Sequence, residues 1–181
     1  MDRPILFSGP MVRAILDGRK TMTRRIYKPK FDKWKVGDRL WVREAYVEYL
    51  PEKTEGMEDW DYDNPQVAYR ATEPDFLKDC FDAESRREYD ELGYVSRWRP
   101  SIFMPRRLSR ILLEITELKR ERIKDCSNGD AIREGFLCET EFWEYFWKMN
   151  AKRYPQGVDE MLLMDNPEVL AIGFKVLEAK K

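Results

Sequence analysis

Residues 18–25, with the sequence GRKTMTRR, combine side chains from which a small chemical site can be built. Strand periodicity would place Thr21, Thr23 and Arg25 on one face of an extended segment, beside Lys20 at the junction with the preceding helix. An ammonium, a hydroxyl and a guanidinium that converge can bind an anion or polarise a carbonyl group. A lysine whose pKa is lowered by burial or by neighbouring cations can act as a base. A basic run is also typical of a solvated surface, so the spacing leaves both interpretations open.

The chain contains no histidine, and this excludes a large set of reactions. Relays of serine or cysteine with histidine cannot form within it, and neither can Cys/His zinc sites. The cysteines Cys80, Cys126 and Cys138 include no close pair that would suggest zinc or redox chemistry. We therefore expect no metal and no cofactor, and a general acid or base must be Lys, Asp, Glu, Tyr, Cys or a chain end.

The elements around the basic segment follow from apolar periodicity and from helix signals. Residues 3–8 are expected to form a strand, and the helix that follows has Pro10 in its first turn and stops at Gly18. Residues 39–49 alternate as a strand. Further strands are expected over residues 66–72, 109–123 and 166–179, and helices over residues 74–92, 127–136 and 140–154. The apolar side chains of the last helix are expected to pack in the core: Phe142, Trp143, Phe146, Trp147 and Met149.

Charge is distributed unevenly along a chain whose net charge is only −1. Basic residues concentrate in 17–44, and acidic residues concentrate in 51–97, which we interpret as an insertion or elaborated loop. The length of 181 residues predicts one domain over 1–181. No run of about 18 apolar residues and no signal-peptide pattern is present, so we expect no membrane span and a cytoplasmic location.

The order of these elements predicts an α+β fold, with a small, partly open β-barrel that has helices at its ends. A strand returning at the C-terminus would close the edge that a single sheet exposes. In this arrangement the charge of residues 17–44 would line a cleft for an anionic or polar ligand. A sequence pI of about 5.8 favours a short or single-nucleotide ligand over a long duplex.

The motif of Gly18, Lys20, Thr23 and Arg25, followed by the "GD" turn of residues 37–38, resembles the ASCH domain family, a branch of the PUA-like β-barrels. Segments 99–116, 130–136 and 166–176 resemble longer, phage-type members. Residues 51–97 resemble them least. Phe103 stands where related sequences often carry histidine, and the chain is far longer than the small amidohydrolase of the family.

The resemblance implies a PUA-like barrel that recognises RNA or a modified nucleoside. A small bacterial member of the family removes the acetyl group from N4-acetylcytidine with a lysine, a threonine and a glutamate. By resemblance these are Lys20, Thr23 and Glu134, the last in the A-x-x-E segment of residues 131–134. Lys20 would take the proton of Thr23, which would attack the amide carbonyl, and Glu134 would orient Lys20 or carry the proton.

Three functions therefore stay open. The first is hydrolysis of an N4-acylcytidine-type amide by Lys20, Thr23 and Glu134. The second is an RNA-binding module without catalysis, or an RNA-cleaving protein. The third is a protein-interaction role through the acidic insertion. The side chains expected to bind the substrate are Arg19, Thr21, Arg24, Arg25, Arg43 and Trp41.

Overall fold

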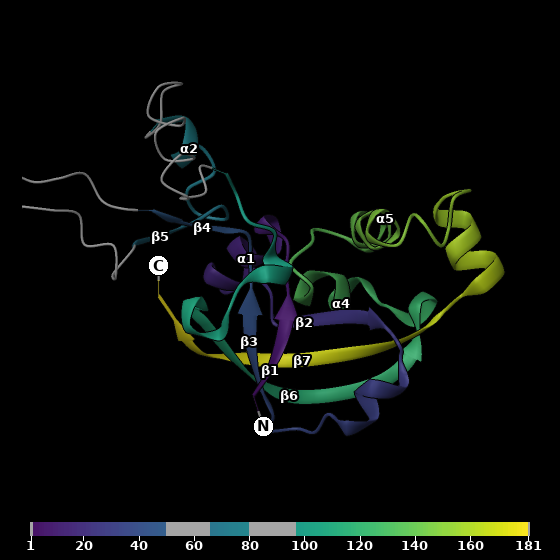
Figure 1. Ribbon diagram of the computed structural model, residues 1–181. Helices are drawn as coiled ribbons and strands as arrows, with labels where there is room; N and C mark the ends of the chain where they lie inside the picture. Colours follow the sequence, from purple (N-terminus) through teal and green to yellow (C-terminus); the bar gives the residue numbers. More distant parts are fainter. Residues whose placement is uncertain (1, 50–65, 80–96, 181) are drawn as a thin grey trace, which may run out of the picture. The chain divides into compact units, whose positions relative to one another are not determined.

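The computed structural model describes residues 2–49, 66–79 and 97–180 (Figure 1). Within this part the chain is mixed α and β, as the sequence predicts. It forms two compact units, which are described separately below. The first unit comprises Met1–Arg3, Ala14–Leu40 and Ile111–Lys180, and the second comprises Pro4–Arg13 and Trp41–Arg110. This division does not test the prediction of one domain over residues 1–181.

The five-stranded sheet has the order β1-β3-β6-β7-β2, which runs from one edge strand to the other. The described strands therefore form an open sheet and not a closed barrel. The C-terminal strand β7 (Glu168–Ala179) lies inside the sheet, where it pairs antiparallel with β6 (Ile111–Arg122) and with β2 (Met22–Ile26). The described strands do not show the expected closure, because β7 lies inside the sheet and β1 and β2 remain its edge strands.

The first unit is built on the long β6–β7 ladder, along which Figure 1 shows β2 running. Register shifts in β6 fall between Leu112 and Leu113 and between Ile115 and Glu117. The unit also holds α4 (Asn128–Arg133), which contacts both β2 and α5 (Glu139–Met149). Its remaining elements are the 3-10 helices η1 (Pro29–Lys33) and η4 (Ile123–Asp125) and the π-helix η5 (Glu160–Asp165).

Helix α5 is shorter than the predicted span of 140–154. Phe142 and Phe146 pack in the core, where Phe142 lies against the Phe136 ring. Trp143 and Trp147 are half-buried. Met149 is 60% exposed, so the prediction that it belongs to the core was wrong. The helix presents one buried stripe, and the remaining apolar side chains lie at its margins.

The second unit contains a two-stranded sheet of β4 (Tyr46–Tyr49) and β5 (Gln66–Tyr69), together with α2 (Phe76–Asp79), η2 (Ser101–Phe103) and η3 (Arg106–Leu108). Two apolar clusters hold it together. One contains Val47, Ala68 and Leu77, and the other contains Tyr46, Met104 and Leu108. Strands β1 (Asp2–Leu6) and β3 (Arg39–Arg43) and helix α1 (Gly9–Leu16) each have residues in both units.

Most predicted elements are confirmed within the described residues, and the strand over 39–49 differs from its prediction. Residues 39–49 were expected as one strand but form β3 and β4, which are separated by Glu44 and Ala45. The Glu44 carboxylate there accepts hydrogen bonds from Arg110 at 2.9 and 3.0 Å. The predicted helix over 74–92 is described only as α2, and most of the expected insertion at 51–97 lies outside the described residues.

Candidate functional site

The turn between α1 and β2 brings Lys20 to the interior of the first unit. Gly18 adopts a positive φ of 73°, which an L side chain rarely adopts. The main-chain amides of Arg19 and Lys20 then both donate to the Ala14 carbonyl oxygen at 2.9 Å. The chain reverses within three residues, so the lysine follows the helix directly and enters the core.

Helix α4 supplies the partner of Lys20. Ser127 caps its N-terminus, accepting from the main-chain amide of Asp130, and the Asp130 carboxylate accepts from the Ser127 amide in return. The helix ends at Arg133 with Glu134 as its C-cap, and Gly135 follows with a φ of 92°. The start and the stop of this short helix are both set by local sequence, and together they fix the position of Glu134.

Lys20 contacts the end of α4 twice. Its Nζ donates at 2.7 Å to the Glu134 main-chain carbonyl and at 2.7 Å to the Glu134 carboxylate oxygen Oε2. The Thr21 amide donates to the Arg133 carbonyl at 2.8 Å. A helix C-terminus favours a cation and leaves carbonyl groups without partners inside the helix. Lys20 satisfies both requirements, and this explains why a glutamate is tolerated at this helix end.

The lysine and its partner are removed from water. The side chains of Lys20 and Glu134 are 1% and 3% exposed. Burial lowers the pKa of the Lys20 ammonium below its usual value, because the charged form loses its hydration, and the Glu134 carboxylate opposes this shift only in part. The cationic side chains of Arg25 and Arg24 lower that pKa further. A buried lysine with a lowered pKa has the property that a general base needs.

Arg24 joins the pair from β2. Its guanidinium lies 2.7 Å from Glu121, 3.1 Å from Asp130 and 3.5 Å from Glu134 Oε1. The Arg24 side chain is 1% exposed and the Glu121 side chain 4%. Glu134 therefore lies between two cations, one on each carboxylate oxygen. A buried carboxylate is retained in its charged form only when it is paired in this way.

Thr23 lies between Met22 and Arg24 on β2 and is buried. Arg24 donates to the Met22 sulfur at 3.3 Å, so these two side chains share a face of the strand. Alternation then directs the Thr23 side chain to the opposite face. Within the described part of the chain, no hydrogen bond joins its hydroxyl to Lys20 or Glu134. The structure thus brings together Lys20 and Glu134, two of the three predicted catalytic residues. The third, Thr23, lies on β2 without a hydrogen bond to either of them.

The predicted binding residues are dispersed. Arg25 is half-buried, and burial lowers its pKa. Arg19 is exposed, pairs with Asp17 at 2.9 Å and donates to the Gly135 carbonyl at 3.4 Å. Thr21 is exposed.

Arg43 and Trp41 belong to the second unit. There the Arg43 guanidinium carbon lies 4.7 Å from the centre of the Trp41 ring. The Trp41 side chain is buried, which fits packing beneath the arginine better than an open stacking platform. Glu44, the next carboxylate along the chain, pairs with Arg110.

Sequence reasoning did not identify Glu121, Asp130 or Cys126 as neighbours of the site. Glu121 lies in a charged stretch of β6 that is exposed on both sides of it, so no periodicity distinguishes it. Asp130 follows Ser127 at the spacing of a capping box, but its ion pair with Arg24 joins two segments that are distant in sequence. Burial raises the pKa of the Cys126 thiol to about 12, so this cysteine is not a nucleophile at neutral pH.

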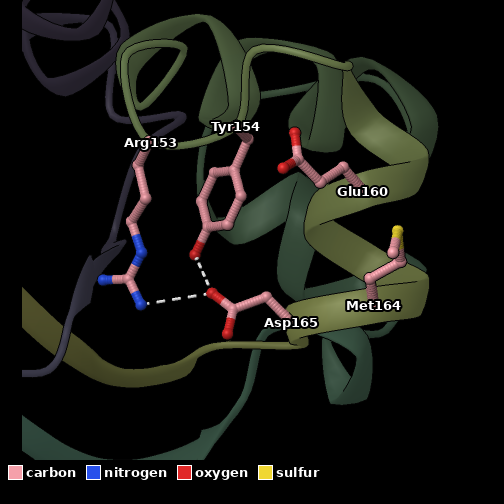
Figure 2. Close-up of a pocket in the computed structure, with 5 residues that line it drawn as sticks. All are labelled: Arg153, Tyr154, Glu160, Met164 and Asp165. Carbon is pink, nitrogen blue, oxygen red and sulfur yellow. Dashed lines mark hydrogen bonds and ion pairs between the residues drawn. The ribbon is translucent and has the colours of Figure 1, made fainter.

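A recess of about 360 Å³ is lined by residues that follow α5 and by residues of η5 (Figure 2). Its lining residues are Arg153, Tyr154, Glu160, Met164 and Asp165. Figure 2 shows the Asp165 carboxylate held by two of these side chains: it accepts from Tyr154 at 2.5 Å and from Arg153 at 3.1 Å. No predicted site residue lines this recess. Asp165 and Arg153 pair with each other, and the Glu160 carboxylate accepts from the Gln156 main-chain amide at 2.9 Å, which favours a structural role.

Comparison with protein-family models, curated proteins and solved structures finds no match to this chain. The interpretation of the site therefore depends on its own geometry. In the described ranges, no group of three or more His, Cys, Asp or Glu side chains is placed to hold a metal ion. In the same ranges, no helix combines the length and apolar character that a membrane crossing requires.

Proposed function

We propose that this chain is an ASCH-type protein of the PUA-like class that recognises RNA or a modified nucleoside and hydrolyses an N4-acylcytidine-type amide. One observation carries the proposal: Lys20 and Glu134, 114 positions apart in sequence, form a buried pair with a Nζ–Oε2 distance of 2.7 Å. The pair combines a lysine of lowered pKa with a carboxylate held by a second cation.

The proposed reaction uses these groups as base and proton carrier. Neutral Lys20 accepts the proton of the Thr23 hydroxyl, and the Thr23 oxygen attacks the amide carbonyl carbon. The tetrahedral intermediate collapses as the C–N bond breaks, and the leaving amine receives the proton from Lys20 through Glu134. Water then hydrolyses the acyl ester on Thr23. Because the Lys20 side chain is 1% exposed and the Thr23 side chain lies on the face of β2 opposite Arg24, this reaction requires a movement that opens the site to the substrate and brings the Thr23 hydroxyl to Lys20.

The second candidate is recognition of RNA without catalysis. It is favoured by the absence of a hydrogen bond between the Thr23 hydroxyl and Lys20 in the described structure, and by the mutual neutralisation of Lys20 and Glu134. RNA cleavage would need the same base. The third candidate, a partner bound by the acidic segment, depends on residues that lie mostly outside the described ranges.

Turnover of N4-acetylcytidine by the purified protein tests the first proposal. Release of cytidine should be abolished by Lys20→Met and by Thr23→Val, and lowered about 10²–10⁴-fold by Glu134→Gln, the usual range for losing acid–base catalysis. Lys148→Met, which removes an exposed lysine of α5, is the matched control and should leave turnover unchanged. Unfolding curves for each variant distinguish lost chemistry from lost folding.

The pH profile adds a second criterion. Since the Lys20 pKa is lowered, turnover should rise with pH along a curve whose midpoint lies below that of an ordinary lysine. Hydrolysis that survives Lys20→Met in a folded protein would rule out the assignment. No release by the folded wild-type protein would favour the second candidate.

A further inference from the structure

Four arginines of the second unit gather around two shared partners, and we define them as the arginine patch: Arg43, Arg99, Arg106 and Arg107. The guanidinium carbons of Arg43 and Arg106 lie 4.7 and 5.9 Å from the centre of the Trp41 ring. Arg107 and Arg99 both contact the Glu48 carboxylate, at 2.7 and 3.5 Å. Two guanidinium groups on one carboxylate leave a positive charge in that group of three.

Two exposed apolar side chains lie close in sequence to two of these arginines. Ile102 and Phe103, in η2, are 58% and 68% exposed, and η3 begins three residues later with Arg106 and Arg107. An isolated exposed apolar residue is ordinary, but an exposed aromatic side chain three residues before two exposed arginines is a recognisable combination. It offers a flat face for stacking beside cations that bind phosphate.

The backbone of the loop that carries Phe103 is held by packing and by hydrogen bonds. Met104 is fully buried with Tyr46 and Leu108. The Tyr46 hydroxyl donates to the Phe103 carbonyl at 3.2 Å, and Arg43 Nε donates to the Met104 carbonyl at 3.0 Å. The backbone at Phe103 and Met104 is therefore ordered before a ligand binds. This lowers the conformational entropy cost of binding.

From these contacts we infer that the arginine patch with Phe103 is a binding surface for single-stranded nucleic acid. Phe103 stacks on a base, and Arg106 and Arg107 contact the phosphates on either side. Guanidinium groups match phosphate geometry better than ammonium groups do, and every cation of the patch is an arginine. This inference rests on the proposed function only for the class of ligand, a nucleic acid. The surface and the polynucleotide that it binds are not required for hydrolysis of a free nucleoside.

Fluorescence anisotropy of the 181-residue protein with a labelled oligouridine of about 12 nucleotides tests this surface. Phe103→Ala should weaken binding about 5- to 150-fold, the equivalent of one lost stacking contact, and Phe103→Trp should retain it. Arg106→Gln/Arg107→Gln should also reduce the slope of log affinity against log salt by about 1.4, at about 0.7 for each lost phosphate contact. The matched control, Arg120→Gln/Lys148→Gln, removes two exposed cations of the first unit and should change affinity less than about twofold.

Three results would overturn the inference. Unchanged affinity in Phe103→Ala would exclude stacking. Equal losses of affinity in the two double variants would show that binding depends on the overall positive charge and not on this surface. Binding to phosphatidylserine vesicles but not to oligouridine would assign the surface to a membrane. Thr23→Val, which should abolish the proposed hydrolysis, should bind oligouridine like the wild type, so the two proposals fail separately.

Discussion

Lys20 Nζ lies 2.7 Å from both the carboxylate and the main-chain carbonyl of Glu134, so one ammonium group neutralises the side chain and satisfies the end of a helix. Each of these contacts depends on burial and on the turn geometry around it. The stability of the first unit should therefore respond strongly to changes at this pair, whatever reaction the site performs.

Lys20→Met should lower the free energy of unfolding by about 3–5 kcal/mol, because it leaves the buried Glu134 carboxylate without its lysine. Urea denaturation measures this loss. Lys148→Met removes an ammonium that lies 3.9 Å from Glu144, in a pair whose side chains are 67% and 58% exposed, and should cost less than about 1 kcal/mol.

The double variant Lys20→Met/Glu134→Leu separates ion pairing from packing. Apolar residues often replace a buried pair without loss, so the double variant should recover much of the stability that Lys20→Met loses. A double variant that is no more stable than Lys20→Met would show that Arg24, left beside Glu121 and Asp130, needs Glu134 as well.

Arg24→Met should be at least as destabilising, with an expected loss of about 3–5 kcal/mol, because Glu121 and Glu134 would both lose a buried cationic partner. The comparison is Arg133→Gln, which removes a guanidinium that pairs with Glu117 at 3.1 Å but is 43% exposed. Water screens that pair, and its loss should cost less than about 1 kcal/mol. Similar losses in thermal or urea unfolding would contradict the buried network.

The sequence supported the prediction of the local elements of this site better than the prediction of its assembly. Ser127 and Gly135 mark the ends of α4, and Gly18 marks the turn before Lys20, because capping and positive φ act over a few residues. The pairing of Glu134 with Lys20 was expected only from a family resemblance. Burial of Glu121 depends on contacts between distant segments, and no local pattern in a charged stretch encodes it.

The open sheet and the divided strand show the same limit at a larger scale. Residues 39–49 were predicted as one strand, but the strand is interrupted at Glu44, whose partner Arg110 lies 66 positions away. The pattern of neighbouring residues cannot predict an interaction between segments so far apart in sequence. The returning C-terminal strand was predicted, but its place between β6 and β2 was not, because sequence order does not fix the order of strands in a sheet.

Gly135→Ala should disturb the position of Lys20. A Cβ atom at Gly135 would lie 3.3 Å from Lys20 Cβ and 3.1 Å from Ala14 Cβ, at a φ of 92°. Gly157→Ala is the matched control, because its φ is 113° and no atom lies within 4 Å of the added Cβ. Backbone strain of about 1–3 kcal/mol is common to both, so the excess loss in Gly135→Ala measures crowding at the site. Equal losses of unfolding free energy in the two variants would show that Lys20 and Ala14 move to accommodate the added Cβ atom without cost.

Cys126 should make the protein less stable at alkaline pH. Burial raises the pKa of its thiol from an ordinary value near 9 to about 12. Between these values the unfolded thiol ionises while the folded thiol keeps its proton, so the folded state binds more protons and stability falls as pH rises. The loss begins near pH 9 and is limited to about 1.4 kcal/mol per pH unit for one group.

Urea denaturation of the wild type, Cys126→Ala and Cys138→Ala between pH 7 and 10.5 measures this contribution. Wild type and Cys138→Ala should lose stability above pH 9 more steeply than Cys126→Ala, because Cys138 is exposed and Cys126 is buried. Differences between variants are the readout, since other groups titrate in the same range and contribute equally to each protein. Parallel curves for all three proteins would show that the Cys126 thiol ionises in the folded state as readily as in the unfolded chain.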